Sequence, residues 1–324
     1  MKIARLTYEG IESNLDVELN ILGTKGTIEF VTFAQEGGSI EKLIKDLQPY
    51  EAIITDYVPL TKEILSKLDN CKVISVAATG FTSVDVVAAK EKGIVVCAIG
   101  EYCTQEVADH AMTLMLALQR RLLKFNKVIQ EDKKWDWSVA PDIERVEGQT
   151  IGILGFGKIG QAVGKRAKAF GLNVIAYDPY LPSIIAEKQG VKLMELDDVL
   201  GESDIISVHM AVDNSNKGFL DYDKFKKMKK QPFLVNVSRG AAIEEPDLVR
   251  TLDEGLIKGA GIDVLITEDP VLEGHPLVGR ENVILTPHIA FYSKTSMYFS
   301  SKITIENLIN VLEGNLDKTN KIVN

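Results

Sequence analysis

Short apolar runs alternate with amphipathic stretches along most of the chain. Apolar runs typical of buried strands occur at 2–7, 52–54, 72–77, 94–96, 150–154, 173–177, 191–193, 204–208, 233–236, 260–262 and 283–285. Stretches with apolar residues three and four apart, which predict helices, occur at 40–47, 61–68, 84–92, 183–189, 196–200, 246–254 and 293–312. Because parallel strands need crossover helices between them, this alternation predicts an α/β protein built on parallel sheets.

A longer helical pattern covers residues 104–128 and has a continuous apolar face. It contains the pair Arg120-Arg121, and we expect a single helix that connects the first half of the alternating series to the second. The stretch 133–147 has no clear period and holds both tryptophans, Trp135 and Trp137. We interpret it as a loop that covers a cleft or contacts another subunit, with core packing of either tryptophan as the alternative.

The most informative stretch is 151–178, where a strand, a turn, a helix and a second strand follow one another. The turn reads Gly-Phe-Gly-Lys-Ile-Gly, which fits the pattern G-x-G-x-x-G. Gly155 permits a tight turn, Gly157 lets the backbone approach a pyrophosphate, and Gly160 lets the helix pack close to its strand. The strand, turn and helix therefore predict a phosphate-binding site, with a turn that merely needs glycine as the alternative.

The residues after these glycines complete a dinucleotide-binding pattern. The N–H groups of Lys158 and Ile159, at the helix start, face the phosphates, and the helix dipole favours their negative charge. Asp178 ends the second strand about 20 residues beyond the loop, where a carboxylate accepts hydrogen bonds from an adenosine ribose. A phosphate on that ribose would be repelled by Asp178, and residues 179–182 offer no arginine to bind it. The pattern therefore predicts NAD, rather than NADP, as the cofactor.

Composition narrows the class of protein further. With 324 residues, 45% of them hydrophobic and 26% charged, the chain is typical of a globular protein with two ordinary domains. A net charge of −9 and a pI near 5.2 argue against a nucleic-acid partner, and we interpret the lysines at 224–230 as a solvated helix face. We expect no signal peptide and no membrane span. Three cysteines without metal or disulfide spacing favour a reducing cytoplasm and no metal site.

Five polar residues share one position, the carboxyl end of a predicted strand. They are Asp178, His209, Arg239, Asp263 and His288. In open α/β sheets, ligands bind beyond the carboxyl ends of the strands. We therefore expect these side chains to converge on the cofactor, although they lie far apart in the sequence.

Hydride transfer to a keto group needs a proton donor for the oxygen and a group that holds the substrate's charge. His288 suits the first task and Arg239, with its planar fork of donors, the second. A nearby carboxylate such as Glu268 would favour the imidazolium and fix the ring. Each residue also has a structural interpretation, since the histidine could cap a loop, the arginine could lie in a surface turn and the glutamate could be solvated. We interpret His110 and His275 as structural.

Several motifs, in this order, resemble the NAD-dependent D-2-hydroxyacid dehydrogenases over nearly the whole chain. Besides the glycine loop, they are Ala78-Thr79-Gly80 with Val84-Asp85, Glu106-Val107-Ala108-Asp109-His110, Asn236-Val237-Ser238-Arg239-Gly240, Asp263-Val264 and Thr286-Pro287-His288-Ile289-Ala290. The run 102–104 resembles the branch that includes C-terminal-binding-protein corepressors and glycerate or phosphoglycerate dehydrogenase-like enzymes. Ala211 and Asp269 depart from the common pattern, since many members have proline there.

The resemblance implies a role for each matched residue. Arg239 binds the keto acid, His288 donates the proton in reduction and acts as base in oxidation, and Glu268 pairs with His288. Asp263 contacts the nicotinamide carboxamide, and Thr104 lies at a loop position near the nicotinamide. Further cofactor contacts are implied for His209 and Ser238, and backbone N–H groups around Ala78, Thr79 and Gly80 hold the substrate carboxylate.

We therefore expect two Rossmann-like doubly wound parallel-sheet domains with a cleft between them. Residues 1–100 with 292–324 form the expected substrate domain, and residues 101–291 the expected NAD-binding domain. The expected reaction is the reversible reduction of a 2-keto acid by NADH to a D-2-hydroxy acid. A homodimer is expected from the long apolar helix after Thr104.

Two other functions stay open. The first is a catalytically weak, NAD(H)-sensing oligomeric binding protein of the corepressor type, against which the complete set of Arg239, Glu268 and His288 speaks. The second is a formate dehydrogenase, although that branch pairs its histidine with glutamine instead of glutamate. The pattern does not identify the substrate side chain, and the candidates for its pocket are Tyr57, Phe81, Tyr102 and residues near Tyr292.

Overall fold

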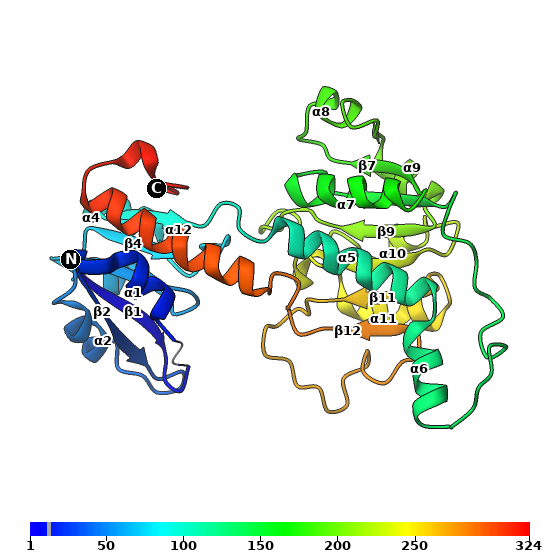
Figure 1. Ribbon diagram of the computed structural model, residues 1–324, viewed down its shortest axis with the longest axis horizontal. Coiled ribbons are helices and arrows are strands. Elements are labelled where there is room, and N and C mark those ends of the chain that lie inside the picture. The colour runs from blue at the N-terminus through cyan, green and yellow to red at the C-terminus, as the bar shows by residue number, and fades with distance from the viewer. Residues whose placement is uncertain (12–13) are drawn as a thin grey trace. The chain divides into compact units, whose positions relative to one another are not determined.

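The computed structural model describes residues 1–11 and 14–324. The chain divides into two compact units, one formed by Met1–Tyr102 with Ser293–Asn324 and the other by Cys103–Tyr292 (Figure 1). Each unit is built on its own parallel sheet. The predicted architecture of two Rossmann-like α/β domains is therefore confirmed.

The first unit has a five-stranded sheet in the order β2-β1-β3-β4-β5. Its strands are β1 (Lys2–Tyr8), β2 (Thr27–Phe33), β3 (Ala52–Thr55), β4 (Val73–Val76) and β5 (Val95–Ala98). All residues of β3 and β4 are buried, as expected for central strands with both faces covered. The order 2-1-3-4-5 is that of doubly wound folds with helices on both faces.

Helices cover both faces of this sheet. They are α1 (Asp16–Leu22), α2 (Ile40–Leu47), α3 (Lys62–Leu65), α4 (Val86–Lys92) and α12 (Lys294–Leu312), with short 3₁₀ turns at Gly23–Lys25 and Leu316–Lys318. Helices α2, α3 and α4 share one core with the sheet, and α1 and α12 share the other. The last residues return to the sheet, since Ala98 N–H donates to Lys321 O and Val323 N–H donates to Val96 O.

The second unit has a seven-stranded parallel sheet in the order β12-β11-β10-β9-β6-β7-β8. Its strands are β6 (Thr150–Leu154), β7 (Asn173–Tyr177), β8 (Lys192–Leu193), β9 (Ile205–Val208), β10 (Phe233–Asn236), β11 (Gly259–Ile262) and β12 (Val283–Leu285). The chain reverses its direction of travel across the sheet between β6 and β9, which are neighbours. Such a switch point is where dinucleotides bind in this class of fold.

The helices of the second unit also cover both faces of its sheet (Figure 1). They are α5 (Thr104–Gln119), α6 (Leu122–Gln130), α7 (Lys158–Ala169), α8 (Ser183–Glu187), α9 (Leu196–Glu202), α10 (Tyr222–Phe225) and α11 (Glu245–Asp253), with a 3₁₀ turn at Gly240–Ala242. Helices α5 and α7 pack against each other and against the strands, while residues of α9, α10 and α11 form the core on the other face. The apolar face of α5 is thus buried inside its own unit, as Val107, Leu114 and Leu118 show. The homodimer expected from the long apolar helix after Thr104 stays a prediction, and the buried face of α5 does not itself offer a surface to a second chain.

The expectation of a single helix over 104–128 is wrong, because α5 ends at Gln119 and α6 begins at Leu122. The break lies at Arg121, whose φ of 50° is left-handed and incompatible with a continuous α-helix. The Arg121 guanidinium pairs with Asp142 at 2.5 Å and lies 5.4 Å from the centroid of the Phe233 ring. These contacts stabilise the chain reversal that starts α6.

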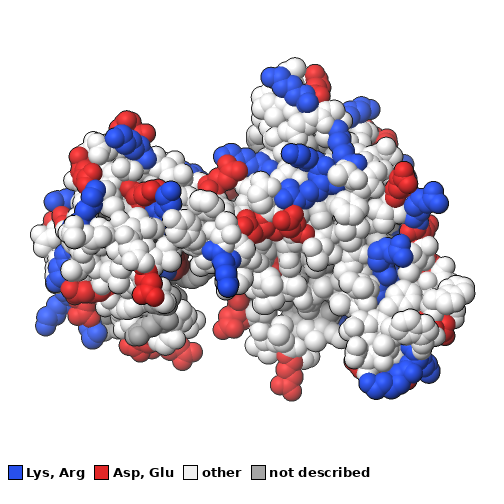
Figure 2. All heavy atoms as spheres, in the orientation of Figure 1, with Lys and Arg blue, Asp and Glu red and all other residues white. Residues whose placement is uncertain are grey.

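The exposure and pairing of surface side chains decide between the alternatives left open for the two tryptophans and the lysine run. Trp135 and Trp137 are 92% and 84% exposed, so core packing of either tryptophan is excluded. The lysines at 224, 226, 227 and 230 pair with aspartates, so this basic run is balanced by acidic side chains. The expected helix face is wrong, because α10 ends at Phe225 and only Lys224 lies in it. Figure 2 shows basic and acidic side chains interspersed on the face that it draws. No helix in the described ranges is both long and apolar enough to cross a membrane.

Candidate active site

The polar residues singled out in the second unit follow its strands in spatial order along one edge of the sheet. His288 follows β12, Asp263 follows β11, Arg239 follows β10, His209 follows β9 and Asp178 follows β7. The glycine loop follows β6, between the last two. Because all paired strands are parallel, every one of these residues lies at the carboxyl edge. The topology therefore brings together side chains that are far apart in the sequence.

The glycine loop fits a dinucleotide phosphate at each of its glycines. Gly155 has φ +89°, and a Cβ there would lie 2.6 Å from backbone atoms of Met210. A Cβ on Gly160 would lie 2.3 Å from Gly155 O, so the helix could not approach the strand. A Cβ on Gly157, by contrast, would meet nothing within 4 Å. Gly157 is therefore not needed for packing, and it leaves open space at the start of α7, a position at which helix N-termini commonly bind phosphate.

The N-terminus of α7 is suited to anion binding. Gly157 is its N-cap and has no side chain with which to cap the helix. The first N–H groups of a helix have no acceptor within the helix itself, so they can face an anion. Asp178 stands next to this loop, since its Oδ2 accepts the Phe156 N–H at 2.9 Å and its Oδ1 accepts the Tyr180 and Leu181 N–H groups. These bonds hold a carboxylate beside the loop, in the position expected for a ribose acceptor.

Arg239 is carried by a rigid turn after β10. The buried Asn236 side chain donates to Arg239 O at 2.9 Å and accepts from the Ser238 N–H and hydroxyl. Gly240 follows, and a Cβ there would lie 1.9 Å from Leu265 O, so this turn packs directly on the chain after β11. The Arg239 side chain is exposed and donates one hydrogen bond, to Ser238 O at 2.7 Å. It has no ion pair with any carboxylate among the residues described, so most of its five donors remain for a ligand.

His288 and Glu268 form a pair at the same edge. His288 Nδ1 lies 2.7 Å from Glu268 Oε2, and the imidazole meets the Phe291 ring edge-on at 6.0 Å between centroids. The His288 side chain is 32% exposed and that of Glu268 is 65% exposed, so water or a substrate can reach them. With Nδ1 held by the carboxylate, Nε2 is the nitrogen through which this imidazole can exchange a proton with a ligand.

Asp263 is the buried centre of the loop that carries His288. Its side chain is fully buried, its Oδ1 accepts from Thr286 Oγ1 at 2.5 Å and from the Ile289 N–H, and its Oδ2 accepts from the Ala290 N–H. Its pKa is lowered, because hydrogen bonds outweigh the burial that alone would raise it. The residue is thus an ionised carboxylate enclosed by donors of its own chain. Its contact with a nicotinamide carboxamide stays a prediction.

His209 has an unusual environment. Its ring is buried, Nε2 lies 2.7 Å from Ser207 Oγ, and Nδ1 has no hydrogen-bond partner among the described residues. Burial lowers the pKa of this imidazole to about 3, so it is neutral at physiological pH. Its backbone faces Gly155, where an added Cβ would lie 2.8 Å from the main-chain carbonyl carbon of His209. The residue therefore supports the glycine loop through backbone contact.

The other predicted site residues are placed as follows. Thr104 was expected in a loop. That position is wrong, because Thr104 is the first residue of α5. Residues Ala78, Thr79 and Gly80 follow the carboxyl end of β4 in the first unit, and Thr79 and Gly80 are exposed. His275 pairs with Glu245 at 3.2 Å, which agrees with a structural role. The structural interpretation of His110 is incomplete, because its ring reaches Thr286 and Asp263.

Sequence reasoning missed Thr286 and the role of His110 at this edge. One signal was present. Val107, His110, Ala111 and Leu114 share the helical spacing of the buried face of α5. A histidine on such a face must find a polar partner, but the pattern does not say which one.

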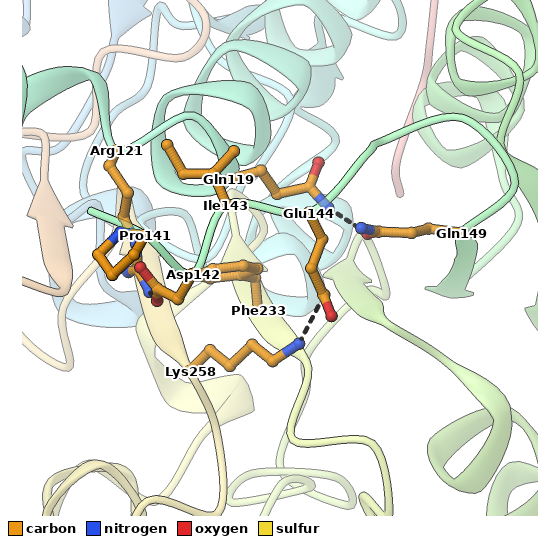
Figure 3. A pocket seen from close by; sticks show the side chains of 9 residues that line it. All are labelled: Gln119, Arg121, Pro141, Asp142, Ile143, Glu144, Gln149, Phe233 and Lys258. Atoms are coloured by element: carbon orange, nitrogen blue, oxygen red, sulfur yellow. Dashed lines mark hydrogen bonds and ion pairs between the residues drawn. The ribbon is translucent and has the colours of Figure 1, made fainter. Parts of the chain in front are cut away.

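A pocket of about 330 Å³ lies at the opposite, amino-terminal edge of the same sheet (Figure 3). Figure 3 shows Glu144 pointing to Lys258 and Gln119 to Gln149. Arg121 at this edge is paired with Asp142. Because its charged side chains are paired with one another, the pocket offers no proton donor or free anion-binding group for hydride transfer, and the candidate site remains at the carboxyl edge.

Comparison with known proteins agrees with this geometry. The sequence model of the family described as "D-isomer specific 2-hydroxyacid dehydrogenase, NAD binding domain" matches residues 112–290. A hydroxypyruvate reductase from Blautia hydrogenotrophica is 36% identical over 282 residues, which cover 85% of this chain and 86% of that protein. A D-3-phosphoglycerate dehydrogenase from Archaeoglobus fulgidus is 34% identical over 86% of this chain, but the match spans only 52% of that protein.

A solved structure has the same two-domain fold. An acyclic imino acid reductase in complex with NADPH and D-Arg superposes with a TM-score of 0.86, at 26% identity over the full length of both chains. The relatives named here are reductases and dehydrogenases, and none is a binding protein of the corepressor type. The chain therefore belongs to the D-isomer-specific 2-hydroxyacid dehydrogenases, which are NAD-dependent oxidoreductases of 2-hydroxy acids.

Proposed function

We propose that this enzyme reduces a 2-keto acid through Arg239, His288 and Glu268. The observation that carries the proposal is the 2.7 Å contact between His288 Nδ1 and Glu268 Oε2, two strands away from a guanidinium without a carboxylate partner among the described residues. This arrangement offers a proton donor and an anion-binding group at one edge of one sheet.

In the reduction, NADH supplies the hydride that the carbonyl carbon of the keto acid accepts. Arg239 binds the substrate carboxylate and polarises the carbonyl, because its planar fork matches two oxygen atoms. His288 Nε2 gives its proton to the carbonyl oxygen, and in the reverse direction it takes the proton back. Glu268 orients the ring and stabilises the imidazolium. The product is a 2-hydroxy acid.

The remaining site residues have supporting roles in this proposal. The N–H groups at the start of α7 bind the pyrophosphate, and Asp178 accepts hydrogen bonds from the adenosine ribose. The negative charge of Asp178 favours NADH over NADPH. We place Ser238, Asp263, Thr104 and His209 near the nicotinamide half. Residues 78–80, in the first unit, offer backbone N–H groups to the substrate carboxylate, which makes that unit the substrate domain.

The substrate is proposed to be a short, polar 2-keto acid. Hydroxypyruvate is the first candidate, since the Blautia relative is named for it, and 3-phosphohydroxypyruvate is the second, from the Archaeoglobus relative. Glyoxylate, pyruvate and 2-keto-isocaproate test smaller and more apolar side chains. Tyr57, Phe81, Tyr102 and Tyr292 remain the candidates for the residues that distinguish these side chains.

The test is NADH consumption, followed by absorbance, with this set of 2-keto acids, together with NADPH as the second reductant. We expect turnover with at least one acid and a preference for NADH. NADH binding without turnover of any acid would contradict the proposal and favour the sensing protein. Turnover that is faster with NADPH would remove Asp178 as the discriminating residue.

We also propose that the enzyme is a homodimer, now on a different surface. The segment 122–137 exposes Leu122, Leu123, Trp135 and Trp137 by 52–92% of their area. Large apolar side chains gathered on one segment mark an interaction surface. Light scattering should give twice the chain mass, and Leu123→Lys should reduce it; a wild-type monomer would end the proposal.

A reducing cytoplasm is the proposed location. Cys71, Cys97 and Cys103 form no disulfide in the described chain, and all three are buried. Burial raises the pKa of Cys71 and Cys97 to about 12, so both stay thiols. Cell fractionation that places the protein in an oxidising compartment would contradict this.

A further inference from the structure

His110, on helix α5, begins a hydrogen-bonded chain that ends at the loop of His288. Its Nε2 lies 3.0 Å from Thr286 Oγ1, and Thr286 Oγ1 donates to Asp263 Oδ1 at 2.5 Å. The direct distance from His110 Nε2 to Asp263 Oδ1 is longer, 3.4 Å. The three residues are therefore connected in series, with the threonine hydroxyl in the middle.

The direction of each hydrogen bond follows from counting protons. Asp263 is an acceptor, so the single hydroxyl proton of Thr286 is used in the bond to its Oδ1. Thr286 Oγ1 can then only accept from His110, and His110 Nε2 must carry the proton. The ring therefore orients the Thr286 hydroxyl towards the carboxylate.

Asp263 in turn fixes the backbone next to His288. Its two oxygens accept the N–H groups of Ile289 and Ala290, and its main-chain carbonyl accepts the N–H of His288 at 2.7 Å. His288 has φ +52°, a left-handed conformation that is unfavourable for a residue with a side chain. Such a conformation persists only where the surroundings enforce it, and here the Asp263 hydrogen bonds do so.

Burial alone would raise the pKa of Asp263, but the nearby His110 ring, the Thr286 hydroxyl and the backbone N–H groups at 289–290 hold it below its usual value. Losing the His110 donor leaves the Thr286 hydroxyl, and through it the Asp263 carboxylate, less firmly held in the position that supports the loop. Among the residues that the structure describes, the structural histidine His275 pairs with Glu245 and with the backbone of its own loop, and no comparable chain of hydrogen bonds reaches it.

We infer that His110 is a positioning residue, which acts through Thr286 and Asp263 to hold the 286–290 loop in the strained conformation that aims His288 at the substrate. This inference rests on the proposed role of His288 as proton donor. His110 itself touches neither substrate nor cofactor in the inferred role. It ties the helix that enters the second unit to the loop that carries the chemistry.

The test uses two pairs of variants of the full chain. His110→Leu removes the donor and keeps an apolar packing group, whereas His110→Gln keeps an N–H donor. Thr286→Val removes the middle hydroxyl, and Thr286→Ser keeps it. Thr113→Val is the matched control, because Thr113 lies on the same helix and its hydroxyl donates to the main-chain oxygen of Asp109, away from the chain that reaches Asp263.

We expect His110→Leu and Thr286→Val each to lower kcat by roughly 10- to 100-fold, the cost of a slightly misplaced reacting group, while KM and NADH affinity change little. His110→Gln and Thr286→Ser should recover most of the rate, and Thr113→Val should match the wild type. The double variant His110→Leu/Thr286→Val should be no slower than the worse single variant, since both break one chain. A normal kcat in His110→Leu, or additive losses, would overturn the inference.

Two readouts are independent of activity. Amide hydrogen exchange over 286–290 should accelerate in His110→Leu and not in Thr113→Val; equal protection in both would contradict the inference. The chain has only four histidines, so imidazole ¹⁵N spectra can be assigned by single substitutions, and His110 should carry its proton on Nε2. A proton on Nδ1 alone would also overturn it.

The outcomes separate the inference from the function on which it rests. If His288→Ala keeps full turnover, the proposed role of His288 fails, whatever the exchange data show. If His288→Ala is inactive while His110→Leu has normal turnover and normal exchange, only the role of His110 fails.

Discussion

The two edges of the seven-stranded sheet carry similar residue types but use them differently. At the amino-terminal edge, Arg121 is paired with Asp142 and Lys258 with Glu144. At the carboxyl edge, Arg239 has no carboxylate partner in the described chain, and His288 sits in a left-handed conformation. Arg121 is left-handed too, so backbone strain alone does not mark a functional site. The difference lies in whether the charge is already neutralised.

That difference has a physical reason. An arginine held by its own carboxylate has little left to offer a ligand, and exposed pairs of this kind add little stability. An arginine without such a partner keeps its electrostatic attraction for an anionic substrate. An arginine without a carboxylate partner in the described chain, at the same sheet edge as a histidine–carboxylate pair, is thus a better indication of chemistry than the presence of a pocket.

The largest effect is expected for His288→Ala, which tests whether the carboxyl edge carries the chemistry. Without the proton donor, kcat should fall by roughly 10²–10⁴, while NADH affinity stays close to that of the wild type. Stopped-flow turnover and NADH fluorescence titration measure the two quantities. An unchanged rate would remove His288 from the chemistry.

The two arginines provide the matched comparison. Arg239→Ala should lower kcat/KM by roughly 10²-fold, because the group that binds and polarises the substrate is lost. Arg121→Ala removes a neutralised arginine at the other edge and should leave kcat/KM within about twofold, a difference of ~0.4 kcal/mol. Equal losses in the two variants would mean that the pairing of charges does not distinguish the edges.

Two substitutions in the glycine loop distinguish an effect on cofactor affinity from an effect on protein stability. Gly157→Ala adds a methyl group into open space, so thermal stability should not change, while NADH affinity should fall about tenfold, or ~1.4 kcal/mol. Gly160→Ala places a methyl group against Gly155 O and should lower both the melting temperature and the affinity. Calorimetry and NADH titration decide, and a large loss of stability in Gly157→Ala would contradict the assignment of that space to the phosphate.

The last prediction concerns His209 and acid stability, and it leaves turnover at neutral pH unchanged. The pKa of its buried ring is lowered from 6.5 to about 3, so the unfolded chain takes up a proton over this interval that the native protein does not. The free energy of unfolding should therefore decrease as the pH falls from 6.5 towards 3 and be insensitive to this group above 6.5. His209→Gln should flatten the curve. Urea unfolding between pH 4 and 6.5 measures it above the range where Asp263 is protonated, and an unchanged slope would contradict the prediction.

Local patterns predicted much of this fold. The bounds of β10 and β12 agree with the apolar runs at 233–236 and 283–285, because a buried parallel strand is apolar throughout. The edge strand β2 was missed, since Thr27–Phe33 mixes buried and exposed positions. The break before α6 was also missed, because a left-handed arginine has no signal in the sequence.

The candidate site likewise has one part that local patterns predicted and one part that they missed. The glycine loop and Asp178 form one continuous local pattern, and the strand-end positions of Arg239 and His288 follow from the alternation of elements. The contact between His110 and Thr286 joins positions 176 residues apart. No periodicity of α5 could identify that partner, because the partner depends on which strands become neighbours.

The return of the chain end to the first sheet has a consequence of its own. Strand β5 is an outer strand, and residues 321–323 run antiparallel beside it, with Cys97 opposite Ile322. An uncovered outer strand would be a template for pairing with other molecules. Truncation after Thr319 should therefore make the protein prone to aggregation before it affects the reaction. The last few residues thus protect the outer strand from pairing with other molecules.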